Sequence, residues 1–124
     1  MRIVIGISGA SGVVLGYEML KALKSIPNCE VHLVYTEGAV KNFECETNIS
    51  MEEVRALADV VHNNKNMAAS ISSGSFKTDG MIVVPCSMKT LAGIAAGYAE
   101  NLLLRSVDVS LKENRKVVLV PREM

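Results

Sequence analysis

Hydrophobic and polar positions along this chain follow two different periods, which alternate from one end of the sequence to the other. Short apolar runs rich in β-branched residues predict strands at residues 3–7, 30–35, 81–84 and 116–120. Segments with apolar residues at helical spacing predict helices at residues 13–24, 50–61, 87–96 and 100–113. This alternation predicts an α/β fold, a Rossmann-like or flavodoxin-like parallel sheet with helices on both faces.

The turn after the first predicted strand is rich in glycine and serine, with the sequence Gly-Ile-Ser-Gly-Ala-Ser-Gly at residues 6–12. Small residues let backbone amides approach a phosphate, and the hydroxyls of Ser8 and Ser11 and the following helix N-terminus add to its attraction. The spacing matches neither a P-loop nor the G-x-G-x-x-G fingerprint. The turn therefore predicts a phosphorylated ligand, with close packing of strand and helix as the alternative.

Composition narrows the class of protein. The chain has 124 residues, of which 49% are hydrophobic and 21% charged, which predicts one globular domain over residues 1–124. Its 13 basic and 13 acidic residues cancel, and it has no Trp, so we expect no nucleic-acid partner and no attraction to an anionic membrane. No run approaches membrane-spanning length or a signal-peptide core, which predicts a cytoplasmic protein.

The cysteines and histidines are too few and too scattered to predict a disulfide framework or a metal site. Three cysteines lack C-x-x-C spacing, and only two histidines could join them. Cys86 follows a predicted strand at the start of a helix, where it is either a nucleophile or a buried thiol. Because no base lies nearby in the sequence, we favour the buried thiol.

The other unusual segments also follow predicted strands, at residues 36–38, 85–90 and 121–123. Ligands of parallel α/β sheets bind beyond the carboxyl ends of the strands, so we expect these segments to converge. Ser87 and Thr90 would stand at a second helix N-terminus there.

Helical spacing puts Arg105, Asp108 and Lys112 on one helix face. They form either an exposed ion-pair ladder or, with Arg122, a cationic pocket for an anionic leaving group. The serine-rich run at residues 72–75 either donates to the same anion or is a plain surface loop.

Motifs along the whole chain carry a resemblance to a known family. In order they are G-I-S-G-A-S-G at 6–12, E-T at 46–47, S-S-G-S-F at 72–76, P-C-S-M-K-T-L at 85–91, N-L-L-L-R at 101–105, D-V-S-L-K-E at 108–113 and L-V-P-R-E at 119–123. Together they resemble the UbiX/Pad1 flavin prenyltransferases, most closely the branch encoded with phenolic and hydroxyaryl acid decarboxylases.

The resemblance implies a three-layer flavoprotein architecture and an enzyme that joins the dimethylallyl group of dimethylallyl phosphate to reduced FMN, without a metal. The product, prenylated FMN, would serve a UbiD-type decarboxylase. The family also implies a homo-oligomer, often built from trimers into a dodecamer. By position, the implied FMN contacts are Gly9, Ala10, Ser11, Thr36, Ser87, Thr90 and Arg122. The implied contacts to the prenyl phosphate are Ser73, Gly74, Arg105, Lys112 and Arg122, and the implied catalytic residues are Ser11, Glu46 and Glu123.

The chain also differs from the family in ways that bear on its function. Family members continue beyond the position of Met124, so we expect a shortened member with an incomplete prenyl-phosphate pocket and an exposed sheet edge. One alternative is an FMN-binding accessory subunit without activity of its own. Another is a flavin-dependent cysteine decarboxylase, although the P-A-S-A-N-T-type motif of that class is replaced here by residues 85–90 and its catalytic histidine is not evident.

Overall fold

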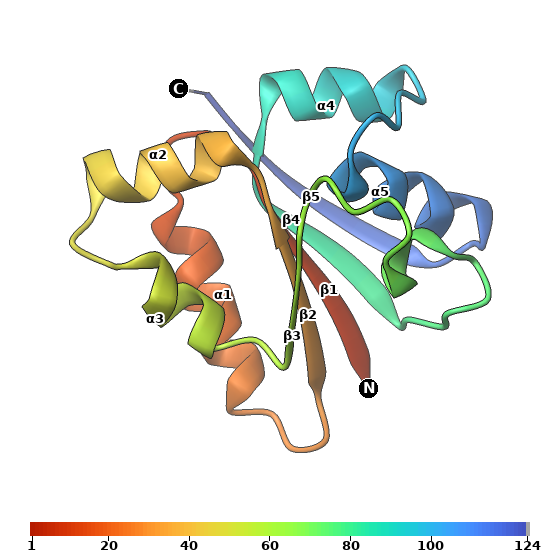
Figure 1. The fold of residues 1–124 in the computed structure, drawn as a ribbon, viewed down its shortest axis with the longest axis horizontal. Helices are drawn as coiled ribbons and strands as arrows, with labels where there is room; N and C mark the ends of the chain where they lie inside the picture. Colours follow the sequence, from red (N-terminus) through yellow and green to blue (C-terminus); the bar gives the residue numbers. More distant parts are fainter. Residues whose placement is uncertain (124) are drawn as a thin grey trace.

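A computed structural model describes residues 1–123 and contains a five-stranded sheet in the order β3-β2-β1-β4-β5. Every neighbouring pair of strands is parallel. The strands are β1 (Arg2–Ile7), β2 (Glu30–Tyr35), β3 (Val60–His62), β4 (Gly80–Ser87) and β5 (Lys116–Arg122). The chain adds strands on one side of β1 and then on the other, which confirms the predicted doubly wound α/β fold (Figure 1).

Helices cover both faces of the sheet (Figure 1). They are α1 (Val14–Lys24), α2 (Glu37–Glu46), α3 (Met51–Ala56), α4 (Met88–Ala95) and α5 (Leu102–Lys112), with a short 3-10 helix η1 (Ser70–Ser72). The first three pack on one face, and η1, α4 and α5 pack on the other. Within residues 1–123, no helix has the length and hydropathy needed to cross a membrane.

Period-2 alternation on the central strand explains this layering. Ile5 and Ile7 of β1 are fully buried against the α1 side, whereas Val4 is buried against the α5 side. Gly6 keeps the α5 face close, because a Cβ there would lie 3.1 Å from Cδ1 of Leu103. The central strands are thus hydrophobic on both faces, as a parallel sheet requires.

One predicted helix is wrong in its second half. Ser50 and Glu53 form a complete capping box, but α3 ends at Ala56 instead of residue 61, and β3 follows it. Pairing of β3 with β2 overrides the helical spacing of the sequence, because Val60 and Val61 are β-branched and Val34 offers a partner to His62. The sheet therefore gains an edge strand that the hydrophobic pattern did not predict.

The strands β4 and β5 extend further than predicted, and this extension positions the site. β4 continues through Pro85 to Ser87, with a cis peptide bond at Val84–Pro85 and a register shift between Val83 and Cys86. β5 continues to Arg122, which pairs with Ser87 across the ladder. The carboxyl ends of both strands thus reach the same edge of the sheet.

Candidate functional site

The carboxyl edge of the sheet presents two helix N-termini. Thr36 caps α2 by accepting a hydrogen bond from the amide of Ala39 at 3.1 Å, and Ser87 caps α4 by accepting one from the amide of Thr90 at 3.2 Å. The first two amides of each helix, at Glu37 and Gly38 and at Met88 and Lys89, have no acceptor within their helix, and the helix dipoles make this edge attractive to anions. The structure therefore brings the segments after β2 and β4 to one edge of the sheet, where their helix N-termini favour anion binding.

The glycine-rich turn lies against the start of α2. A Cβ on Gly9 would stand 2.7 Å from both the Cα and the carbonyl carbon of Gly38, so the two backbones touch at this point. Gly12 has a φ of +86°, in the left-handed region that favours glycine. The turn is held tightly between β1 and α2, and Gly38, which received no role in the sequence analysis, is the residue that allows the approach.

The two serines of the turn differ in availability. Ser8 is buried, and its hydroxyl donates to the carbonyl of Pro85 at 3.0 Å and accepts from the amide of Ser87 at 2.7 Å. This hydroxyl ties β1 to β4, which corrects the expectation that it adds a bond to a ligand. Ser11 is more open, and its hydroxyl donates to the carbonyl of Glu123 at 2.6 Å.

Glu46, the last residue of α2, reaches back to the same turn. Its carboxylate accepts from the amide of Gly12 at 3.0 Å and from the side-chain amide of Asn42 at 2.7 Å. The pKa of Glu46 lies below its ordinary value, chiefly because of the bond from Asn42 and then that from Gly12. The nearby charge of Arg122 makes a smaller contribution in the same direction. Glu46 is thus a carboxylate at neutral pH.

Asn42 was missed by the sequence analysis, although its spacing to Glu46 is that of helical neighbours. That signal becomes readable only once a helix over residues 37–46 is recognised.

Arg122 completes this edge. The carbon at the centre of its guanidinium lies 3.4 Å from the position that a Cβ on Gly12 would take. The backbone amide of Ser11 donates to the carbonyl of Glu123 at 3.3 Å, which fixes the end of β5 against the turn. The residues that the resemblance assigns to FMN and to catalysis therefore share one edge of the sheet: Gly9, Ala10, Ser11, Thr36, Glu46, Ser87, Thr90, Arg122 and Glu123.

A second group of predicted residues lies on the α5 face. Asp108 pairs with Arg105 at 3.8 Å and with Lys112 at 3.0 Å, so the predicted ion-pair ladder is formed. Arg105 also donates to the carbonyl of Ser72 at 3.2 Å, beside the predicted contact Ser73.

Gly74 lies near the other end of α5. Arg115 donates to its carbonyl at 2.6 Å, and a Cβ on Gly74 would stand 3.1 Å from the carboxyl carbon of Glu113.

Within one chain, Lys112 and Arg122 do not meet as the pocket hypothesis expected. Lys112 precedes the start of β5, whereas Arg122 is the last of its 7 residues. At a rise of about 3.3 Å per residue, these two positions lie about 20 Å apart along the strand. The reason is topological, since α5 runs antiparallel to β5 and ends at the amino edge of the sheet (Figure 1).

Cys86 is fully buried, and burial raises the pKa of its thiol to about 11. This confirms the buried thiol and excludes an activated nucleophile, because almost no thiolate forms at neutral pH. Among residues 1–123, no group of three or more His, Cys, Asp or Glu side chains is arranged to hold a metal ion.

Comparison with known proteins relates this geometry to a family. The flavoprotein family model matches residues 1–124. The chain is 73% identical over its whole length to a probable UbiX-like flavin prenyltransferase from Sedimentibacter hydroxybenzoicus, and it spans 66% of the length of that protein.

Solved structures agree with this relationship. A dodecameric FMN-dependent UbiX-like decarboxylase from Escherichia coli O157:H7 superposes with a TM-score of 0.97 at 58% identity, covering 100% of this chain and 67% of that one. AnUbiX (PadA1), in complex with FMN and dimethylallyl pyrophosphate, superposes with a TM-score of 0.96 at 53% identity, covering 99% of this chain and 65% of that one. On the family match and these identities, the chain belongs to the flavoprotein family and, within it, to the UbiX-like flavin prenyltransferases.

Proposed function

We propose that this protein binds FMN at the carboxyl edge of its sheet and transfers a dimethylallyl group from dimethylallyl phosphate to the reduced flavin. The observation that carries the proposal is the convergence of a glycine turn, two helix N-termini and Arg122 at that edge. The solved relative that holds FMN and dimethylallyl pyrophosphate supports both ligand classes. The product, prenylated FMN, would be consumed by a UbiD-type aromatic acid decarboxylase.

The side chains at this edge suit a flavin nucleotide. The amides at the starts of α2 and α4 and the guanidinium of Arg122 are donors for its phosphate. The close approach of Gly9 and Gly38 leaves no side chain between the turn and α2, so the nucleotide can lie against backbone. Under the proposal the FMN contacts are those implied by the resemblance: Gly9, Ala10, Ser11, Thr36, Ser87, Thr90 and Arg122.

When bound, reduced FMN would supply the nucleophilic atoms, N5 and then C6, for attachment of the dimethylallyl group. Cleavage of the allylic carbon–oxygen bond leaves its electron pair on the departing phosphate, and preorganised cations stabilise that charge. In our proposal Arg105, Lys112 and Arg122 provide the cations, and Ser73 and Gly74 contact the same phosphate.

Proton handling falls to groups beside the turn. Glu46 is a carboxylate beside Gly12 and would accept a proton near the flavin, and the hydrogen bonds that lower its pKa keep it ionised but weaken it as a base. Glu123 follows Arg122 at the end of β5 and would exchange a proton with the departing phosphate.

We propose further that the cations on α5 act on the nucleotide edge of a neighbouring copy. Lys112 and Arg122 lie near opposite ends of β5, about 20 Å apart by strand length. A shared pocket would therefore need two chains. The dodecameric assembly of the relative from Escherichia coli O157:H7 supports this arrangement.

The first test is mass spectrometry of the flavin recovered after anaerobic incubation with reduced FMN and, in separate reactions, dimethylallyl phosphate or dimethylallyl pyrophosphate. A reaction without protein and one with Arg122→Ala serve as controls. We expect prenylated FMN from the unaltered chain alone. If the chain retains FMN without modifying it, the proposed transferase activity is overturned and an accessory flavin-binding subunit is supported. If the chain does not retain FMN, the whole proposal is overturned.

The arrangement between copies has its own test. Lys112→Ala and Arg122→Ala are expected to be inactive separately, because each removes one cation from every site. If the pocket forms between chains, subunit exchange between the two variants restores about a quarter of the pockets. Absence of recovered activity after verified exchange would contradict a shared pocket.

A further inference from the structure

The two histidines of the chain are bonded to each other, away from the candidate site. Nδ1 of His32, on β2, lies 2.8 Å from Nε2 of His62, on β3. The two rings are nearly parallel, with an interplanar angle of 13° and 5.1 Å between centroids. His32 is only 3% exposed, so this contact is shielded from water.

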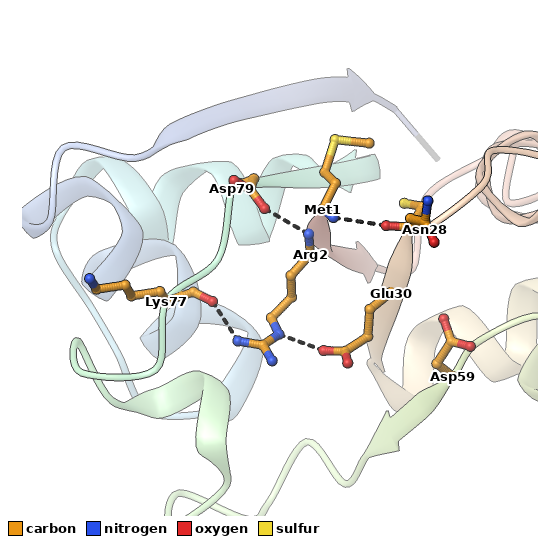
Figure 2. A pocket seen from close by; sticks show the side chains of 8 residues that line it. Met1, Arg2, Asn28, Glu30, Asp59, Lys77 and Asp79 are labelled. Atoms are coloured by element: carbon orange, nitrogen blue, oxygen red, sulfur yellow. Dashed lines mark hydrogen bonds and ion pairs between the residues drawn. The ribbon is translucent and has the colours of Figure 1, made fainter.

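Charged groups of the neighbouring strands continue the network. The other nitrogen of His32, Nε2, lies 2.7 Å from a carboxylate oxygen of Glu30, and Nε of Arg2 donates to that oxygen at 2.5 Å. Arg2 also donates to the carbonyl of Lys77 at 2.8 Å and lies over the ring of Phe76, 4.1 Å from its centroid. Figure 2 shows Arg2 between Glu30 and Lys77 at the amino edge of the sheet.

Proton counting limits the states of this pair. A carboxylate only accepts hydrogen bonds, so Nε2 of His32 carries a proton and donates it to Glu30. One further proton then fits between Nδ1 of His32 and Nε2 of His62. The pair can hold one extra proton with this bond intact, because either ring can then donate to the other. Only when both rings are fully protonated do two donors face each other at a distance of 2.8 Å, with two positive rings side by side. The bond between the strands cannot survive that state.

His62 belongs to a short edge strand, which pairs with β2 on one side only. β3 has 3 residues, and Val60 and Val61 are 38% and 39% exposed. Two residues beyond His62, the backbone carbonyl of Asn64 accepts from the amide of Leu102 at 2.9 Å, and its side chain accepts from the amide of Leu103 at 2.8 Å. These amides begin α5 and have no intrahelical acceptor.

We propose that the His32–His62 contact is a proton-controlled latch, which holds β3 and the amino end of α5 at neutral pH and releases them in mild acid. The inference goes beyond the proposed function and does not rest on it. The contact responds to pH and needs no other ligand.

Charged groups surround the histidine pair on the neighbouring strands and segments. Arg2 and Glu30 face it from β1 and β2, and the segments beside it carry the charged residues Asp59, Lys65, Lys77 and Asp79. The apolar side chains packed on this face include Ile71 of η1 and Leu103 and Val107 of α5.

Burial and the charge of His32 lower the pKa of His62 from its ordinary value of 6.5. The unfolded chain then binds the proton first, so stability is complete above pH 6.5 and declines as the pH falls through that value.

The test is hydrogen exchange of the intact chain between pH 8 and pH 5, corrected for intrinsic exchange and measured on peptides that cover residues 98–104. We expect protection of the Leu102 and Leu103 amides to fall by up to about tenfold per pH unit as the pH falls below 6.5. Peptides from α1 are the internal control and should keep their protection.

His62→Gln retains a hydrogen-bonding nitrogen but does not titrate, so it should make protection at the start of α5 independent of pH in this range. Lys77→Gln is the matched control, because only its carbonyl contacts Arg2. Unchanged protection in the unaltered chain, or an equal loss in His62→Gln, would overturn the latch. NMR of the imidazole nitrogens gives a second measurement on the unaltered chain, and independent protonation of both rings without loss of β3 would also overturn it.

Discussion

Substitution of Gly9 by alanine tests the packing that builds the nucleotide edge. The added Cβ would stand 2.7 Å from the Cα and carbonyl carbon of Gly38 and 3.0 Å from its oxygen, all of them main-chain atoms. Gly80→Ala is the matched control, because its Cβ would meet only the Lys116 carbonyl at 3.4 Å and Ile3 at 3.8 Å. Both changes add one methyl group near the sheet, and only the first forces two backbones apart.

The size of the effect follows from these distances. Carbon atoms in favourable contact are about 3.5 Å apart, so the turn and the start of α2 must separate by about 0.8 Å. Overpacking of this kind costs about 1–3 kcal/mol. With an m-value of about 2 kcal/mol/M, the urea midpoint should fall by about 0.5–1.5 M. Because the shift also displaces the amides at the start of α2, we expect FMN affinity to fall by about tenfold or more.

Urea unfolding at a fixed protein concentration measures the first quantity, and quenching of FMN fluorescence measures the second. Gly38→Ala adds a reciprocal comparison, since its Cβ would lie 3.2 Å from the Cα of Gly9 and should cost less. A midpoint for Gly9→Ala equal to that of the unaltered chain would refute the backbone contact. Equal losses in Gly9→Ala and Gly80→Ala would refute the argument from distance.

Three further substitutions or reactions test single contacts. Asn42→Ala should raise the pKa of Glu46 toward its ordinary value of 4.5, seen by carboxyl NMR titration; since a lowered pKa adds stability that is lost on acidification below 4.5, the variant should lose less stability between pH 5 and pH 3. Asp108→Asn should change the free energy of unfolding by less than about 1 kcal/mol, because its nearer partner Lys112 is 67% exposed, and a much larger loss in urea unfolding would contradict this. In native iodoacetamide labelling at pH 8, Cys45 should react and Cys86 should not, because a pKa of about 11 leaves only about one thiolate in a thousand.

The sheet was largely predictable because most of its strands are local runs of apolar residues. β1 and β2 are apolar runs whose two faces are both buried, and such runs are recognisable without knowledge of their neighbours. β3 is different, since its residues continue the apolar spacing of α3 and no Gly or Pro separates them. Only pairing with β2 makes this segment a strand, and pairing is a property of the folded chain.

The candidate site divides in the same way. That the segments after β1, β2, β4 and β5 meet at one edge follows from parallel topology alone. The use that each hydroxyl makes of its position does not follow, and Ser8 shows why. In the sequence it is indistinguishable from Ser11, yet one hydroxyl is consumed between two strands and the other lies at the open end of the turn.

The cations show most clearly what helical spacing in the sequence cannot predict. Helical spacing fixes the direction in which Arg105 and Lys112 point around α5, and the structure bears out the shared face through Asp108. Spacing says nothing about position along the sheet, and the antiparallel course of α5 puts Lys112 at the edge opposite Arg122. Under the proposal, the flavin contacts all lie on the edge that one chain builds by itself. A pocket that contains both Lys112 and Arg122 needs a second chain, so binding and transfer can be lost separately.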